Sequence, residues 1–204
     1  MSTILITVYD LNMAPIGDLT SPLMEAYADR HQLKFEKTTN LPTDVPASWN
    51  KLPLALDAFD RGYEQVIWMD ADVCITNPLL TPYGFMCSGF HASIDWGEDA
   101  TQPYHFSAGC FVINKNARHL FEWCIEHRDE YATGAFWEQT PLRLLMERGD
   151  KKMFTHPRRV LNSVPLRVHP KVVDPWQRGD FVAHLTMIPV ADKVKLFRAL
   201  RHDS

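Results

Sequence analysis

Short apolar runs alternate with helically spaced apolar positions along the first third of the chain. Residues 4–9 and 33–37 are β-rich apolar runs that predict two strands, and the apolar side chains that follow Ser21-Pro22 predict a helix between them. A second helix is expected over residues 47–61, with Gly62 as its end, and a third apolar strand leads into Asp70. Strands and helices in this order predict an α/β fold around a largely parallel sheet.

The pattern changes after residue 75, where prolines and glycines interrupt the chain before an apolar segment at residues 85–87. Gly109 lies in the strand expected over residues 105–114, where the lack of a side chain would let another group approach the backbone closely. The remaining elements are predicted as strands over 90–94 and 105–114, helices over 117–131 and 136–147, a short segment over 152–156, a loop over 161–165, a strand over 180–185 and a helix over 190–201. The second half therefore predicts a mixed sheet flanked by helices.

The composition fits one globular domain with a sizeable core, since 46% of the 204 residues are hydrophobic and 23% are charged. No run approaches the roughly 18–20 apolar residues of a membrane span, and the N-terminus lacks the basic region of a signal peptide, so a cytoplasmic location is expected. No Cys-x-x-Cys spacing occurs. The four cysteines are expected to be small reduced core residues: Cys74, Cys87, Cys110 and Cys124.

The net charge of −4 is unevenly distributed, because residues 1–150 are acidic and residues 151–204 are basic. Lys193 and Lys195 lie in the basic part, on the predicted terminal helix. Two interpretations are open: a solvated face that balances an acidic body, or a surface for a diphosphate or for peripheral contact with an anionic membrane. The sequence carries no motif for sequence-specific nucleic-acid binding.

Two carboxylates, Asp70 and Asp72, close the apolar strand at residues 66–69. Side chains two apart on a strand point the same way, and the carboxyl edge of a parallel sheet is where ligands bind. Carboxylates so close together repel each other unless a cation or another compensating partner lies between them. The pattern predicts a divalent metal site, and the alternative is a solvated turn, since Asp also favours turns.

Six short segments occur in an order that resembles a known family. They are Trp49-x-Lys51, Asp70-Ala71-Asp72, the run 107–113, Trp137-Glu138-Gln139, the run 162–165 and the run 179–184. This set is similar to the fungal galactosyl- and mannosyltransferases grouped with plant xyloglucan xylosyltransferases, a glycosyltransferase family 34-like pattern. The resemblance implies a single GT-A domain, with a Rossmann-like nucleotide-binding half at residues 1–75 and an acceptor half with the basic tail at residues 76–204.

The same resemblance implies a divalent cation, Mn²⁺ or Mg²⁺, and a nucleotide-sugar donor. Carried over by position, Asp70 would meet the ribose and the metal, Asp72 the metal, and His184 would complete the coordination. Lys51 is the phosphate ligand that the resemblance supports, the alternative being a surface lysine of an amphipathic helix, and Lys193 is a second phosphate candidate. One departure is that the family follows its histidine with an aromatic, a small residue and Gly, whereas this chain has Leu185-Thr186-Met187.

Further candidates surround the expected sugar and base. Glu138 or Gln139 is expected to stabilise an oxocarbenium-like centre, and Asp95 to hold sugar or acceptor hydroxyls. Tyr9, at the end of the first strand, could stack on a base or pack in the core. The aromatic residues Trp96 and Trp137 could stack on sugar faces or pack in the core, and the remaining pocket candidates are His105 and Asn162.

The sequence thus predicts a metal-dependent retaining glycosyltransferase with a UDP-hexose or UDP-pentose donor, GDP-mannose being the second choice, and a glycan or other hydroxyl-bearing acceptor. Two alternatives remain. A haloacid dehalogenase-like phosphohydrolase also places Asp-x-Asp after an apolar strand, although Cys74 replaces the expected Thr or Val and no Gly-Asp-x-x-x-Asp follows. The other alternative is a nucleotide-sugar binding module without turnover.

Overall fold

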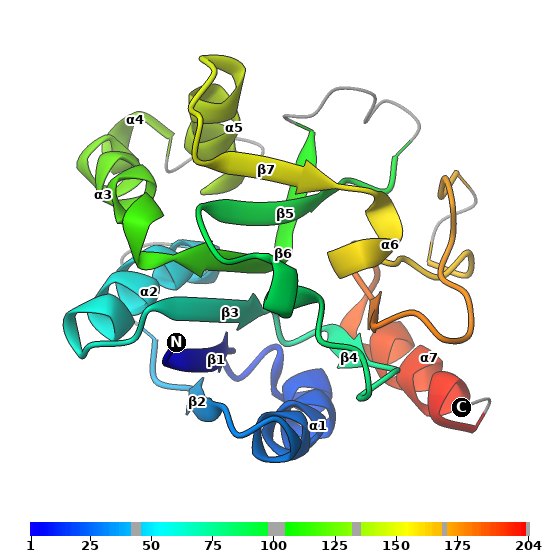
Figure 1. Ribbon diagram of the computed structural model, residues 1–204. Helices are drawn as coiled ribbons and strands as arrows, with labels where there is room; N and C mark the ends of the chain where they lie inside the picture. Colours follow the sequence, from blue (N-terminus) through cyan, green and yellow to red (C-terminus); the bar gives the residue numbers. More distant parts are fainter. Residues whose placement is uncertain (42–45, 98–104, 132–135, 169–170, 203–204) are drawn as a thin grey trace.

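The computed structural model describes residues 1–41, 46–97, 105–131, 136–168 and 171–202, and its centre is a six-stranded mixed sheet with the strand order β2-β1-β3-β6-β5-β7 (Figure 1). Strand β1 pairs in parallel with β2 and β3, β6 runs antiparallel to β3 and β5, and β7 is parallel to β5. The strands are β1 (Thr3–Val8), β2 (Lys34–Thr38), β3 (Gln65–Met69), β5 (Phe90–Ile94), β6 (Phe106–Asn114) and β7 (Met153–His156). The α/β class and the mixed central sheet are confirmed.

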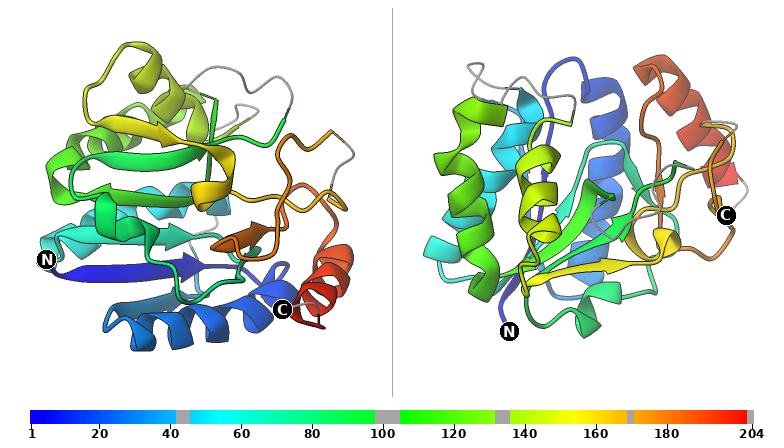
Figure 2. Two further views of the ribbon diagram at one scale, coloured as in Figure 1. Left: turned by 45° about the vertical axis from the view of Figure 1, so that its right-hand side comes forward. Right: turned by 90° about the horizontal axis from the view of Figure 1, so that it is seen from above.

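Helices cover both faces of this sheet (Figure 2). The helices α2, α3 and α5 pack together on one face, and α1 contacts α7 on the other. A separate antiparallel pair, β4 (Val73–Ile75) with β8 (Val182–His184), follows the carboxyl end of β3. The helices are α1 (Ala14–Arg30), α2 (Lys51–Asp60), α3 (Arg118–Glu126), α4 (Arg128–Tyr131), α5 (Gln139–Glu147), α6 (Arg158–Leu161) and α7 (Val190–His202).

Strand β3 explains why the apolar run before Asp70 has no polar alternation. Val66 and Trp68 pack into the core on one face of the sheet, while Ile67 and Met69 pack into the core on the other. A central strand covered by helices on both faces must be apolar on both sides. Asp70 is the first residue after the strand and the first carboxylate of this segment.

The predicted start of the first helix at Ser21-Pro22 is wrong. Helix α1 begins at Ala14 with Pro15 in its first turn, and Pro22 lies inside the helix. Either proline could mark the start of a helix, because proline is common in the first turn. Burial of Ile16, Gly17 and Thr20 against the rest of the molecule decides in favour of the earlier start.

Other boundaries are also corrected. The predicted helix 47–61 begins with a 3₁₀ turn (Ala47–Asn50) before α2, and Gly62 ends it with φ +97° as expected. The predicted helix 117–131 is divided into the 3₁₀ turn Lys115–Ala117, α3 and α4, and the predicted helix 136–147 starts at Gln139. Phe85 ends a 3₁₀ turn (Pro82–Phe85) that precedes β5.

The cysteine prediction holds for three of the four residues. Cys74, Cys110 and Cys124 are buried and free, whereas Cys87 is free but exposed. Cys87 follows the 3₁₀ turn before β5, outside the core packing, so its apolar neighbours in sequence do not bury it. Within the described residues, the structure has no helix long and apolar enough to cross a bilayer.

Candidate active site

A cavity of about 550 Å³ opens where β1 and β3 end. Residues far apart in the sequence line it, because strands of the sheet and the helices α2, α5 and α7 each have residues at or near one end that face the cavity. The lining includes Tyr9 and Asp10 after β1, Ser48 in the 3₁₀ turn before α2, Lys51 at the start of α2, and Asp70 and Asp72 after β3. It also includes Ser107 and Gly109 on β6, Phe136 to Gln139 before and at α5, His184 at the end of β8, Thr186 and Met187 after β8, and Lys193 on α7. Its volume is typical of small-molecule sites.

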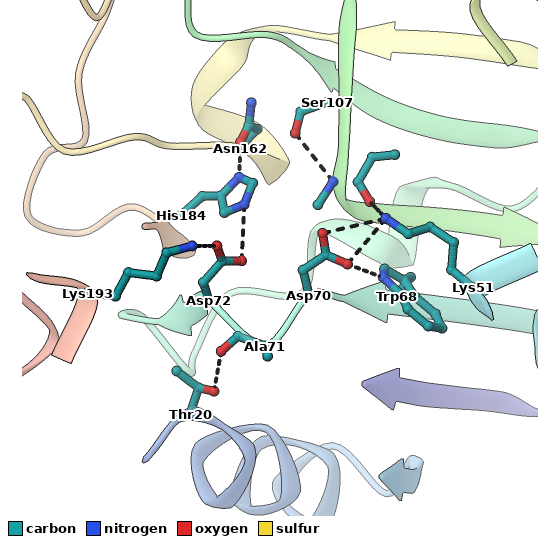
Figure 3. A network of polar contacts seen from close by, with 12 residues as sticks. Thr20, Lys51, Trp68, Asp70, Ala71, Asp72, Ser107, Asn162, His184 and Lys193 are labelled. Carbon is teal, nitrogen blue, oxygen red and sulfur yellow. Dashed lines mark hydrogen bonds and ion pairs between the residues drawn. The ribbon is translucent and has the colours of Figure 1, made fainter. Parts of the chain in front are cut away.

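The turn Asp70-Ala71-Asp72 lines this cavity, and its backbone is bonded to β6, to β4 and, through Thr20, to α1, the last of these contacts being visible in Figure 3. The amide of Asp70 donates to the carbonyl of Gly109 at 2.7 Å, and the amide of Val73 donates to the carbonyl of Asp70 at 2.9 Å. The hydroxyl of Thr20 on α1 donates to the carbonyl of Ala71 at 2.6 Å. With its backbone bonded in this way, the turn presents both carboxylates to the cavity.

Asp70 belongs to a buried charge network with Lys51 and Glu138. The Lys51 ammonium, only 2% exposed, lies 2.8 Å from Glu138 Oε1 and 3.3 Å from Asp70 Oδ1, and it donates to the carbonyl of Ala108 at 3.1 Å. The indole Nε1 of Trp68 donates to Asp70 Oδ1 at 2.7 Å. A buried lysine requires partners of this kind.

Burial and charge act in opposite directions on this network. Burial disfavours the charge of Lys51, but Asp70 and Glu138 outweigh burial and raise the pKa of Lys51 above its usual range. Burial raises the pKa of Glu138 in spite of Lys51, and the nearby Asp70 adds to the rise. The Ser48 hydroxyl opposes this rise in the pKa of Glu138. Oxygen Oε2 of Glu138 is buried and makes no hydrogen bond of ordinary geometry within the described part of the chain.

Asp72 is held on the other side of the turn by Lys193 and His184. The Lys193 ammonium of α7 forms a close ion pair with Asp72 Oδ2, and His184 Nε2 lies 3.4 Å from Asp72 Oδ1. Burial alone would raise the pKa of Asp72, but His184 and Lys193 outweigh burial and hold the pKa well below its usual range. Asp72 is therefore a carboxylate throughout the physiological pH range.

His184 is fixed by Asn162 and by the backbone of β6. Its Nδ1 donates to Asn162 Oδ1 at 2.7 Å, which directs Nε2 toward Asp72. In the charged ring Nε2 carries a proton toward this carboxylate, and in the neutral ring it offers a lone pair to a cation. A Cβ at Gly109 would lie 2.2 Å from His184 Cε1, so only glycine leaves room for the ring. The close approach predicted at Gly109 is thus made by His184.

Asp70, Asp72 and His184 meet as the sequence predicts. One ligand atom from each lies within 4.8 Å of the other two. Carboxylate oxygens and an imidazole nitrogen form a donor set suited to Mn²⁺ or a similar divalent ion. Two lone pairs, on Nε2 of His184 and Oδ1 of Asp72, face each other when the ring is neutral, and a cation between them would satisfy both. The residues present fit a divalent metal.

The other predicted residues are placed in different ways. Gln139 lines the cavity, and its Oε1 accepts a hydrogen bond from the amide of Ala108 at 2.6 Å. Tyr9 also lines it, but its ring is 3% exposed and packs against Gly17, and its hydroxyl donates to Asp18 at 2.8 Å. Both of these lining residues are thus tied to neighbouring elements.

Asp95 is not brought into this set. Its carboxylate lies 3.3 Å from Arg143, and it is not among the described residues that line the cavity. Trp96 packs beside the core on the α7 side. His105 directly precedes β6 and its carbonyl accepts from the amide of Asp95 at 2.8 Å.

The segment after His184 departs from the family in sequence but keeps a glycine-like backbone. Met187 stands where the resemblance expects glycine, and its φ is +59°, in the left-handed region that glycine favours. Its side chain is 78% exposed and lines the cavity with Thr186. Met187 therefore has a backbone conformation that glycine adopts readily, although its side chain is large.

Sequence reasoning missed Thr20 and the positioning role of Asn162. Thr20 is 51 residues before its partner Ala71 in the chain and lies in a helix whose start was predicted too late. Asn162 was expected only as a pocket residue, because its contact with His184 depends on the fold. No motif in the sequence predicts either contact, because the two partners of each are far apart in the chain.

No family model matches this chain, and no curated protein sequence matches it. Solved structures do match. A glycosyltransferase involved in the glycosylation of the major capsid of PBCV-1 is 15% identical, with 98% of this chain and 100% of that chain covered and a TM-score of 0.77. GlyE of Streptococcus pneumoniae is 10% identical over 98% of this chain and 60% of that chain, with a TM-score of 0.54.

A third solved structure is a mutant β-1,4-galactosyltransferase 7 of Drosophila in complex with manganese, UDP-Gal and xylobiose. It is 10% identical over 92% of this chain and 72% of that chain, with a TM-score of 0.56. Together these likenesses show that the chain has a GT-A-like glycosyltransferase fold. The family 34-like assignment is not confirmed.

Proposed function

We propose that this protein is a metal-dependent glycosyltransferase that moves a sugar from a UDP-sugar to a hydroxyl group of an acceptor, with retention of the anomeric configuration. The observation that carries the proposal is the meeting of Asp70, Asp72 and His184 in the lining of a cavity, in a glycosyltransferase fold. The three solved structures compared above are glycosyltransferases, which supports this function over a phosphohydrolase of the haloacid dehalogenase type.

The metal ligands in this proposal are Asp70, Asp72 and His184, and Asn162 keeps the His184 ring in position. When bound, a divalent cation would neutralise the diphosphate leaving group of the donor. Three carboxylates (Asp70, Asp72 and Glu138) form ion pairs there with two ammonium groups (Lys51 and Lys193). One negative charge is left over, and this excess favours cation binding.

Lys193 is the proposed phosphate ligand that moves. Its ammonium occupies Asp72 Oδ2, so a cation that binds Asp72 competes with it. Released from Asp72, the ammonium remains at the cavity wall, where a diphosphate can accept its hydrogen bonds. Lys51 contributes as a fixed positive charge, because Glu138 and Ala108 hold its Nζ.

The UDP-sugar donor is supported by two observations. The cavity has the volume of a small-molecule site, and it lies at the carboxyl ends of β1 and β3, where nucleotides bind in α/β sheets. A protein of the same fold has been solved with manganese and UDP-Gal. Residues 1–75 would then hold the nucleotide, with Tyr9 beside the base.

Retention is proposed through attack on the face of the sugar from which the phosphate leaves. The bond from the anomeric carbon to the phosphate oxygen breaks, a bond to the acceptor oxygen forms on the same face, and the leaving phosphate oxygen takes the acceptor proton. This route needs no separate base. Glu138 is paired with Lys51, and its carboxylate lies where it can stabilise positive charge on the sugar ring.

A donor screen tests the proposal. We expect slow Mn²⁺-dependent release of UDP from at least one of UDP-glucose, UDP-galactose, UDP-N-acetylglucosamine and UDP-xylose, and loss of this release with EDTA. Asp72→Asn and His184→Gln should lower it by about 100-fold, because each removes a ligand. Asp192→Asn, an exposed carboxylate of α7, is the matched control.

Three outcomes separate the alternatives. Full activity in Asp72→Asn or His184→Gln would refute the metal assignment. A Mn²⁺-dependent thermal shift with UDP-sugars but no UDP release would indicate a binding module. Hydrolysis of p-nitrophenyl phosphate without any response to UDP-sugars would indicate a phosphohydrolase. The anomeric proton coupling of the product, measured by NMR, decides between retention and inversion.

A further inference from the structure

Two aromatic side chains stand at the mouth of the cavity. Phe136 and Trp137 both line it, yet 50% and 49% of their surfaces are exposed. We name this pair the aromatic ledge. Large aromatic residues normally bury their rings, so an exposed pair that borders a cavity suggests a ligand surface.

The backbone of the aromatic ledge holds the indole in this exposed place. Trp137 has a φ of +43°, in the left-handed region that bulky residues rarely adopt. The amides of Gln139 and Thr140 donate to the carbonyls of Phe136 and Trp137 at 2.9 and 3.1 Å, which joins the ledge to the start of α5. Strained positions of this kind cluster at ligand sites.

Phe136 is fixed from behind by Arg143. The guanidinium carbon of Arg143 lies 4.4 Å from the centre of the Phe136 ring. Arg143 itself donates to the carbonyl of Phe106 at 2.9 Å and to Asp95 at 3.3 Å. The ring is therefore held by β6 and by the end of β5, and this connection gives Asp95 a positioning role.

Glu138 supplies the polar group next to the aromatic ledge. It is 3% exposed and lines the cavity, and its Oε2 makes no hydrogen bond of ordinary geometry to the residues that the structure describes. A buried carboxylate oxygen without a partner is costly unless a ligand donates to it. An aromatic face beside a hydroxyl acceptor matches a sugar ring, which has an apolar C–H face and hydroxyl groups at its edge.

We infer that Phe136, Trp137 and Glu138 form the subsite for a sugar ring of the acceptor, so that the acceptor is a carbohydrate and not a protein hydroxyl or a nucleobase. The inference rests on the proposed function. Contacts run from Asp70 through Lys51 to Glu138, the residue that follows the ledge in the chain. The donor diphosphate belongs at the metal group, and the exposed ledge is where an acceptor can enter and leave.

Methyl glycosides test this subsite as acceptors. The assay measures UDP release from the donor that the screen identifies, with Mn²⁺, in the presence of methyl glucoside, galactoside, mannoside or xyloside, and with sorbitol as a polyol that has no ring. We expect at least one glycoside, but not sorbitol, to accelerate the release. In Trp137→Ala the ratio of glycoside-stimulated to unstimulated release should fall roughly 10-fold, while Trp137→Phe keeps most of it.

A control and a second readout keep this test independent of turnover. Phe85→Ala removes an aromatic residue that is 91% exposed and lies outside the cavity lining, so its ratio should equal that of the wild type. Saturation-transfer NMR measures glycoside binding directly, and circular dichroism verifies folding. We expect the NMR signal to be lost in Trp137→Ala.

The inference is wrong if no glycoside exceeds sorbitol in both assays, if Trp137→Ala leaves the ratio and the NMR signal unchanged, or if a serine-containing peptide alone stimulates release. A wild-type protein that binds glycosides but releases no UDP from any donor would refute the proposed function and leave the sugar subsite standing. The two failures are therefore distinguishable.

Discussion

Asn162 decides which nitrogen of His184 faces Asp72. Its Oδ1 accepts the Nδ1 proton at 2.7 Å, which leaves Nε2 free as a ligand atom. Outer partners of metal-binding histidines contribute about 10–100-fold to metal affinity. We expect Asn162→Ala to weaken Mn²⁺ binding within that range, as measured by calorimetry, whereas Asn162→Asp retains an acceptor and most of the affinity.

The neighbouring Ser163→Ala provides the control for Asn162. The Ser163 hydroxyl donates to the carbonyl of Arg159, and the Ser163 carbonyl, which accepts from the amide of His184, is kept in this variant. Its Mn²⁺ affinity should equal that of the wild type. Equal affinities in Asn162→Ala and Ser163→Ala would mean that the imidazole needs no support from Asn162.

Lys193 competes with the metal and cooperates with the nucleotide. It is 7% exposed and paired with Asp72, so Lys193→Met frees this carboxylate. We expect Mn²⁺ alone to bind about 10-fold more tightly to Lys193→Met, because no ammonium has to be displaced, and UDP with Mn²⁺ to bind about 10-fold more weakly. Calorimetric titrations with and without UDP measure both effects.

Lys195→Met is the matched control, since this lysine of the same helix is 77% exposed and forms its ion pair with the exposed Asp192. Both affinities should be unchanged in it. If Lys193→Met bound Mn²⁺ no more tightly than the wild type, the competition between the ammonium and the metal would be disproved.

At the scale of elements, α1 supports the metal-binding turn. The Thr20 hydroxyl donates to the carbonyl of Ala71 at 2.6 Å in a buried setting. Thr20→Val keeps the shape but leaves this carbonyl without its donor, which costs about 1–3 kcal/mol of unfolding free energy. Urea denaturation should show this loss, and Thr20→Ser should be close to the wild type. Equal stabilities of the Val and Ser variants would mean that the Thr20 hydroxyl does not stabilise the turn.

The strands and the carboxylate pair could be predicted from the sequence because their information is local. The unbroken apolar run before Asp70 follows from burial on both faces of β3, and two residues of the metal group, Asp70 and Asp72, are separated by one residue in that turn. Helix boundaries were less predictable. At α1 two prolines allow two starts, and only packing chooses between them.

The contacts of the site with distant elements could not be predicted by spacing. His184 was placed by the family resemblance, but its space beside Gly109 and its bond to Asn162 arise only when β6, β8 and the segment after α6 come together. Asp95 illustrates the opposite case: the resemblance placed it near the sugar, whereas in the fold it pairs with Arg143 outside the described cavity lining.

A pH-sensitive contact between two histidines lies at the β7 edge of the central sheet, the edge farther from β1. Nδ1 of His91 on β5 lies 3.0 Å from Nε2 of His156 on β7, and His91 Nε2 donates to the carbonyl of Ser88 at 2.9 Å. The ring of Phe154 stacks on His91. Lys152 is the nearby cation, bound to the Ser88 hydroxyl at 3.3 Å.

Burial lowers the pKa of both His91 and His156, with the like charge of His156 adding to the effect on His91. In the unfolded chain both would take up protons near the ordinary pKa of about 6.5. Between that value and their lowered folded values, the unfolded state binds more protons, so stability falls as the pH decreases. The stabilising contribution of the neutral pair is present above about pH 6.5.

We therefore expect the melting temperature to fall between pH 7.5 and pH 5.5, and to fall less in a His91→Gln/His156→Gln double variant, although that variant is less stable at pH 7.5. Differential scanning calorimetry at both pH values measures the slope. His119→Gln, at a histidine whose side chain is 51% exposed, should keep the wild-type slope. Because Asp72 stays ionised over this range, a slope that the double variant fails to reduce would have to arise from other histidines, and the His91–His156 contact would have no part in it.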